Sequence, residues 1–147
     1  MTHLPETIVV QPGALMATAP AEMTVEQLNM ALAEHGLWLP VSPLTPGLRL
    51  ADLVAHNAGG RRRLAHGPIG RYLRAATLDV ESDPRGEGHA PPATLALGGP
   101  TIKRATGLGL HRAIAGGALG LGRLRELTLS LRPLPAAHAC LALRCAD

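Results

Sequence analysis

Two glycine-rich segments contain the residues whose spacing favours ligand binding. Residues 57–60 read Asn-Ala-Gly-Gly, and residues 116–122 read Gly-Gly-Ala-Leu-Gly-Leu-Gly before a segment of alternating apolar and polar residues. Glycine has no Cβ and tolerates positive φ, so loops of this kind bring backbone close to a bound group. Two such loops separated by a sheet predict a cofactor lying along a cleft. Taken alone, either loop is better explained as a simple turn.

The run over residues 116–122 is only superficially like a dinucleotide fingerprint. It follows an expected helix and precedes an expected strand. A Rossmann loop requires the opposite order, with a strand before it and a helix after it. The sequence therefore argues against a Rossmann site.

Few side chains are candidates for direct chemistry. His56, His66 and His111 lie beside glycine loops and could donate to a ligand, although a lone histidine is more often a surface or structural residue. Lys103 is best explained as a solvated surface lysine. The seven histidines show no pair at helical metal-ligand spacing with a supporting carboxylate, so no metal site is expected. No catalytic residue is assigned.

Length and composition predict one domain over residues 1–147 with an unusual core. A chain of 147 residues buries about 68–70% of its unfolded surface. It contains no Phe, and its aromatic residues are Trp38 and Tyr72. Leucine, alanine, valine and isoleucine must fill the core, and alanine contributes little apolar area. We therefore expect modest stability for the isolated chain and association with another chain.

The charge pattern argues against a nucleic-acid partner. The net charge is +3, and residues 61–63, three arginines, form the one compact basic run. Proteins that bind nucleic acid normally combine a basic face with aromatic stacking platforms, and the aromatics are missing here. The arginine run is explained as a solvated loop or as a contact for an acidic partner or a phosphate.

The sequence favours a cytoplasmic protein with no transmembrane segment. It shows neither a leader-peptide pattern nor a run of 18 apolar residues. Cys140 and Cys145 have four residues between them, a spacing that matches no zinc or redox motif. Two thiols in a reducing compartment are expected.

Local signals predict an α+β domain with a mainly antiparallel sheet. Thr24 and Gln27 form a capping box that begins a helix, and Gly36 is placed to end it. Residues 81–92 are rich in proline, glycine and charge and are expected to form an exposed linker. The other expected elements are strands over 7–11, 72–80, 93–97, 126–132 and 138–144, a short helix carrying Leu50, Leu53 and Val54, and a helix in the second half of 102–115.

The order of these motifs resembles the flavin-binding domain of the vanillyl-alcohol oxidase and p-cresol methylhydroxylase superfamily. Within it, the FAD-binding subunit of bacterial glycolate oxidase is the most similar. The resemblance extends from about residue 7 to residue 135. It is carried by residues 57–60, the spacing from Gly60 to Gly67, and residues 98–103, 116–122, 126–129 and 133–135.

The resemblance implies the second flavin-binding subdomain of that family, a mainly antiparallel sheet flanked by helices, with FAD held mainly by backbone amides. It also implies oxidation of 2-hydroxy acids or alcohols by hydride transfer to the flavin. The expected function is the FAD-binding component of a glycolate-oxidase-like 2-hydroxy-acid oxidoreductase, with another oxidase subunit as partner. By matching position, the cofactor-binding residues are Ser42, Pro43, Asn57, Gly59, Gly60, Gly67, Gly116, Gly120, Gly122 and Leu124.

The sequence also departs from the family pattern. Within residues 1–147 we expect neither the family's pyrophosphate-binding subdomain before residue 7 nor its substrate cap after Pro135. Asp52 stands where a glycine turn is expected, and its carboxylate would repel a nearby phosphate by about 1–4 kcal/mol. Arg71 and Gly109 replace aspartates. The alternatives are a non-catalytic structural subunit of an oxidase complex that has lost FAD binding, for which residues 61–63 are the candidate docking contact, and a decayed gene fragment.

Overall fold

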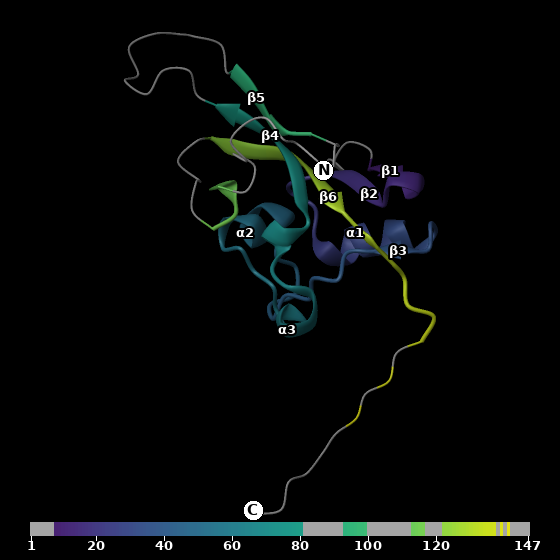
Figure 1. Ribbon diagram of the computed structural model, residues 1–147. Coiled ribbons are helices and arrows are strands. Elements are labelled where there is room, and N and C mark those ends of the chain that lie inside the picture. The colour runs from purple at the N-terminus through teal and green to yellow at the C-terminus, as the bar shows by residue number, and fades with distance from the viewer. Residues whose placement is uncertain are drawn as a thin grey trace, which may run out of the picture.

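The computed structural model describes residues 8–80, 93–99, 113–116 and 122–137, together with 139 and 141. The linker expected over 81–92, most of the helix expected within 102–115, Gly120 and both cysteines lie outside these residues. In the described part, five strands form a sheet of order β1-β2-β6-β4-β5 in which all neighbours are antiparallel (Figure 1). The predicted α+β class is confirmed.

Short helices and a second, two-stranded sheet of β3 and β7 complete the described fold. The strands are β1 (Val9–Gln11), β2 (Met16–Pro20), β3 (Leu37–Trp38), β4 (Leu73–Val80), β5 (Ala93–Gly98), β6 (Arg123–Ser130) and β7 (Arg132–Pro133). The helices are α1 (Val25–Ala33), α2 (Leu50–Ala55) and α3 (Arg63–His66), with 3-10 turns η1 (Pro12–Ala14) and η2 (Ile69–Arg71). The strands expected over 7–11, 72–80, 93–97 and 126–132 are therefore confirmed in β1, β4, β5 and β6.

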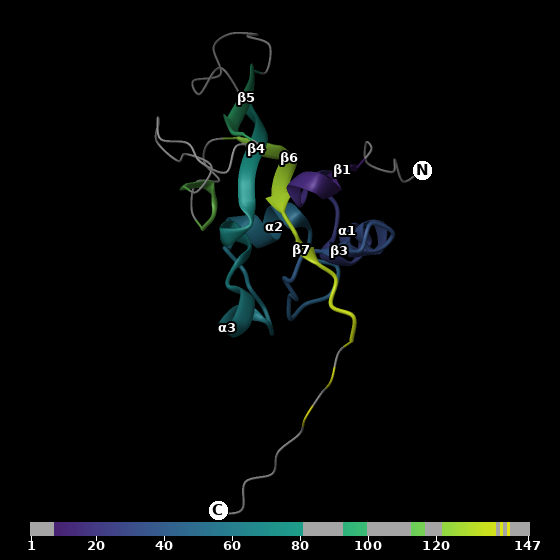
Figure 2. The same cartoon turned by 45° about the vertical axis from the view of Figure 1, so that its right-hand side comes forward.

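Helix α1 begins and ends where the sequence predicts. The Thr24 hydroxyl accepts a hydrogen bond from the Gln27 amide at 3.2 Å, and the Gln27 side chain accepts one from the Thr24 amide at 3.0 Å. After Ala33 the chain turns, and Gly36 takes φ +64°. On α1, Val25, Leu28 and Leu32 are buried against the core, and α1 and α2 lie on the same side of the sheet (Figure 2).

The core is built around β6. Leu127, Leu129 and Leu131 are buried, as their alternation predicts. On the opposite face, Thr18 and Thr128 share a hydrogen bond of 3.0 Å between their hydroxyls. Strand β6 is central because it pairs with both β2 and β4.

The Asn29 side chain fixes the chain segment that leads to Ser42. Its Oδ1 accepts a hydrogen bond from the Leu39 amide at 2.7 Å, and its Nδ2 donates to the Leu39 carbonyl at 3.1 Å. Leu39 itself is fully buried. The amide of Asn29 thus acts as a strand-like partner for a backbone segment that lies outside both sheets.

We predict that Asn29→Ala lowers the free energy of unfolding by about 1–3 kcal/mol, because two buried backbone groups lose their partner. Urea unfolding followed by circular dichroism measures the change. Met30→Ala is the control on the same helix, since the Met30 side chain is 76% exposed. An unchanged stability in Asn29→Ala would contradict the prediction and show that the bridge to Leu39 contributes little.

Candidate functional site

Helix α2 places Asn57 at the centre of the candidate site. Its three apolar residues, Leu50, Leu53 and Val54, are fully buried, as the sequence predicts. After the helix, the Asn57 amide donates to the Val54 carbonyl at 3.1 Å, and the Ala58 amide donates to the Leu53 carbonyl at 2.8 Å. Asn57 takes φ +44°, a conformation that asparagine tolerates better than most residues. The packed helix therefore determines where the Asn57 side chain lies.

Three segments that are distant in sequence meet at Asn57. Its Oδ1 accepts a hydrogen bond from the Gly70 amide at 3.1 Å. The Gly116 amide donates to the Val54 carbonyl at 3.0 Å, and a Cβ added at Gly116 would lie 3.4 Å from the Cβ of Asn57. The structure thus brings Gly116, from the second glycine-rich segment, to the first one.

Ser42 and Pro43 also join this group, through Gly60. Ser42 and Gly60 form an isolated parallel bridge, and the Arg61 amide donates to the Ser42 carbonyl at 2.9 Å. Gly60 takes φ +64°, and a Cβ there would overlap the Ser42 carbonyl oxygen. Only glycine permits this approach of two backbone segments.

At the neighbouring glycines, other atoms of the protein occupy the space that a side chain would need. A Cβ at Gly59 would lie 2.7 Å from Cγ of Arg63, and one at Gly67 would lie 3.2 Å from Cδ of Arg71. A Cβ at Gly70 would lie 2.7 Å from Oδ1 of Asn57. Close packing within the protein therefore explains these glycines without a ligand.

Gly122 and Leu124 lie apart from this group. A Cβ at Gly122 would overlap the carbonyl oxygen of Asp79, near the end of β4. Leu124 pairs with Leu78, and its side chain is buried, so any contact with a cofactor would come from its backbone. At about 3.3 Å per residue, this end of β4 is roughly 20 Å from Leu73, where the strand begins beside the Asn57 group. Gly120 lies outside the described residues.

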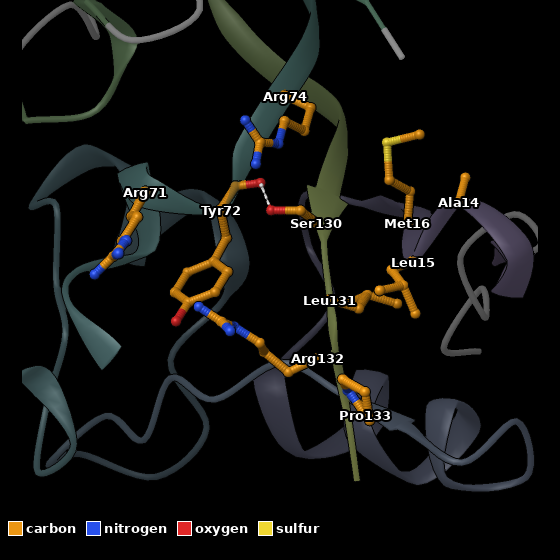
Figure 3. A pocket seen from close by; sticks show the side chains of 10 residues that line it. All are labelled: Ala14, Leu15, Met16, Arg71, Tyr72, Arg74, Ser130, Leu131, Arg132 and Pro133. Atoms are coloured by element: carbon orange, nitrogen blue, oxygen red, sulfur yellow. Dashed lines mark hydrogen bonds between the residues drawn. The ribbon is translucent and has the colours of Figure 1, made fainter. Parts of the chain in front are cut away.

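Two cavities flank the start of β4. The first, of about 350 Å³, lies beside Asn57 and is lined by Asn57, Gly70, Arg71, Leu73, Arg74 and Ala115. The second, of about 380 Å³, also includes Arg71 and Arg74 and adds Tyr72, Ser130 and Arg132 against an apolar wall from residues 14–16 (Figure 3). Both volumes are at the lower end of the range for small-molecule sites. Sequence reasoning assigned no site role to Arg71, Arg74 or Arg132.

The two described histidines near the loops make structural contacts. Nδ1 of His56 lies 2.8 Å from the Asp52 carbonyl oxygen. The His66 ring packs edge-on against Trp38, with centroids 5.7 Å apart, and its carbonyl accepts a hydrogen bond from the Tyr72 hydroxyl at 2.8 Å. His111 and Lys103 lie outside the described residues. These contacts favour structural roles for His56 and His66.

The described part of the chain contains neither a metal-binding cluster nor a membrane-spanning helix. No three or more His, Cys, Asp or Glu side chains gather there in a way that could hold a metal ion. No helix in that part has the length and apolar character needed to span a membrane.

Comparison with known proteins identifies relatives of much greater length. No protein-family model matches the sequence. The chain is 30% identical to a D-lactate dehydrogenase of Archaeoglobus fulgidus over 118 residues, which are 80% of this chain and 25% of that protein. It is 32% identical to a D-lactate dehydrogenase of Anaerostipes hadrus over 102 residues, which are 69% of this chain and 20% of that protein. The chain thus spans a quarter or less of these relatives.

A solved structure shares the fold. An alkyldihydroxyacetonephosphate synthase superposes on 93% of this chain with a TM-score of 0.72 and 17% identity, and the match covers 23% of that protein. This similarity supports the fold of a partial FAD-binding subdomain. The sequence relatives and the shared fold together support assignment of the chain to the superfamily of FAD-binding oxidases.

Proposed function

We propose that this chain is a flavin-binding part of a FAD-dependent oxidoreductase that acts on a 2-hydroxy acid. The observation that carries the proposal is the meeting of Ser42, Gly60, Gly70 and Gly116 around Asn57, beside a cavity of about 350 Å³. The similarity to two D-lactate dehydrogenases supports the same function.

The donors that line this cavity fit a ligand rich in hydrogen-bond acceptors. Asn57 uses its Oδ1 for the Gly70 amide, which leaves its Nδ2 group for a ligand. The Nε atom of Arg74 is buried and has no hydrogen-bond partner among the described residues, although buried polar atoms are normally paired. Both residues line the cavity. Phosphate or ring carbonyl oxygens of FAD are acceptors that such donors would hold.

Asp52 does not oppose binding at this cavity. It lies in the first turn of α2, where its carboxylate accepts a hydrogen bond from the Arg49 amide at 3.4 Å. Asn57 follows the other end of that helix, and Asp52 lines neither cavity. The Asp52 carboxylate would therefore repel a phosphate near the start of α2, and not a group bound beside Asn57.

Bound FAD would supply the hydride acceptor, while Asn57 and the surrounding backbone would orient it. Glycolate and D-lactate are the substrates we propose, because the sequence resembles a glycolate oxidase subunit and its relatives include D-lactate dehydrogenases. We further propose that another oxidase subunit is the partner and that the complex is cytoplasmic.

One observation favours a second candidate, a structural subunit that has lost FAD. The space that Cβ atoms would fill at Gly59, Gly60, Gly67 and Gly70 is occupied by atoms of the protein. These loops therefore keep their shape without a ligand. Such a chain would retain the fold and dock on a complete oxidase.

Titration of the purified chain with FAD, followed by flavin fluorescence, separates the two candidates. We expect saturable binding that Asn57→Ala weakens about tenfold, the effect of about one hydrogen bond. Gln11→Ala is the control, because it removes an exposed amide side chain on β1 that lines neither cavity. A thermal melt of each variant confirms folding. A folded chain that takes up no FAD would support the structural subunit instead.

A further inference from the structure

We propose that Arg71, Arg74 and Arg132 form a binding site for a diphosphate group. They line the cavity of about 380 Å³ together with Tyr72 and Ser130, and we name it the arginine pocket. In Figure 3, Arg71 and Arg132 lie on opposite sides of the Tyr72 ring, and Arg74 lies above it on β4. Two segments distant in sequence, residues 71–74 and 130–133, therefore contribute arginines to the lining of one cavity.

The backbone around the arginine pocket is held by specific hydrogen bonds. The Tyr72 carbonyl accepts from the Ser130 amide at 2.8 Å and from the Ser130 hydroxyl at 3.2 Å. The Leu131 amide donates to the Leu15 carbonyl at 2.7 Å. These bonds set the start of β4 against the end of β6, so the positions from which the arginines project are fixed.

The positive charge of the pocket is not balanced within the described residues. No carboxylate lines the arginine pocket or the adjoining cavity beside Asn57. Glu22 forms ion pairs with Arg49 and Arg123, and none of these three residues lines either cavity. The buried Nε of Arg74 also has no acceptor. A missing acceptor and uncompensated positive charge both indicate an anionic ligand.

The number of guanidinium groups favours a diphosphate over a single carboxylate. Guanidinium forks pair with carboxylate or phosphate oxygens through two parallel hydrogen bonds. One carboxylate brings one negative charge, whereas a diphosphate brings several charges and enough oxygens to engage three arginines. Because Arg71 and Arg74 line both cavities, a diphosphate held here would adjoin the Asn57 cavity. Its source would be free pyrophosphate or, if the proposed function holds, the diphosphate of FAD.

Calorimetric titration of the whole chain with pyrophosphate, FAD and riboflavin, at matched low ionic strength, tests the site. We expect pyrophosphate to bind and to raise the melting temperature, since a ligand that binds the folded state stabilises it. Arg71→Gln and Arg74→Gln should each weaken pyrophosphate binding at least tenfold. Arg49→Gln is the control with the same charge change, because Arg49 pairs with Glu22 and lines neither cavity.

The outcomes distinguish this site from the proposed function. FAD binding tighter than riboflavin binding, with the difference abolished in Arg71→Gln, would identify FAD as the source. Pyrophosphate binding without FAD binding would support the site and contradict the proposed function. No pyrophosphate binding, or an equal loss in Arg49→Gln, would overturn the site even if FAD binds. Arg71 is exposed in a turn, so its variant keeps the test valid if Arg74→Gln fails to fold.

Discussion

Gly60→Ala is expected to lower the free energy of unfolding by about 2–5 kcal/mol, through backbone strain at positive φ and overpacking together. A Cβ at this position would overlap the Ser42 carbonyl oxygen and lie 2.8 Å from Cα of Pro43. Both are backbone atoms that cannot rotate aside as the end of a side chain can. Since small domains are stable by about 5–15 kcal/mol, such a loss would leave a large unfolded fraction on mild heating.

Gly36→Ala is a closely matched control for this prediction. Gly36 has the same φ of +64°, but an added Cβ there would find no atom within 4 Å. The control should therefore lose only the conformational part, about 1–2 kcal/mol. Urea unfolding of both variants gives the difference. Equal losses would mean that the contact between Ser42 and Gly60 does not constrain the fold.

Leu127→Ala is expected to lower the free energy of unfolding by an amount toward the upper end of about 2–5 kcal/mol. Leu127 is fully buried at the centre of the sheet. Its partners on the neighbouring strands are Ala19 on β2 and Ala76 on β4. Two alanines cannot fill the cavity that the substitution leaves, because neither side chain has a rotamer that reaches into it.

The same substitution at Leu64 provides the comparison. Leu64 is fully exposed on α3, so Leu64→Ala should change the stability by less than about 0.5 kcal/mol. Chemical unfolding, with the denaturant slope checked for each variant, measures both. A loss below 1 kcal/mol at Leu127 would show that the neighbouring residues repack around the gap.

The elements that sequence reasoning predicted are those with strong local signals. The capping box of Thr24 and Gln27, the apolar stripe of α2 and the alternation of β6 each depend on residues close in sequence. Strand β2 was not predicted, because Met-Ala-Thr-Ala-Pro has little of the β-branched and aromatic character that marks strands. It forms a strand because β1 and β6 pair with it on both sides.

Within the candidate site, only the loop positions could be predicted from the sequence, because only they have a local signal. Gly60 and Gly116 were recognised as loop positions, and the structure places Gly60 against Ser42 and Gly116 against Asn57. The arginine pocket was not predicted, because it depends on the pairing of Tyr72 with Ser130, residues 58 positions apart. Single arginines in a sequence do not indicate that their side chains will share a cavity.

The internal contacts of the loops around Asn57 have a consequence for ligand binding. Because Gly60, Gly70 and Gly116 are held by hydrogen bonds and close packing of the protein itself, this surface is preorganised. The entropic cost of ordering the loops is met during folding rather than on association, which leaves more of the contact energy for affinity. A molecule that binds beside Asn57 would therefore meet a rigid template, and its affinity would depend on complementarity rather than on induced closure.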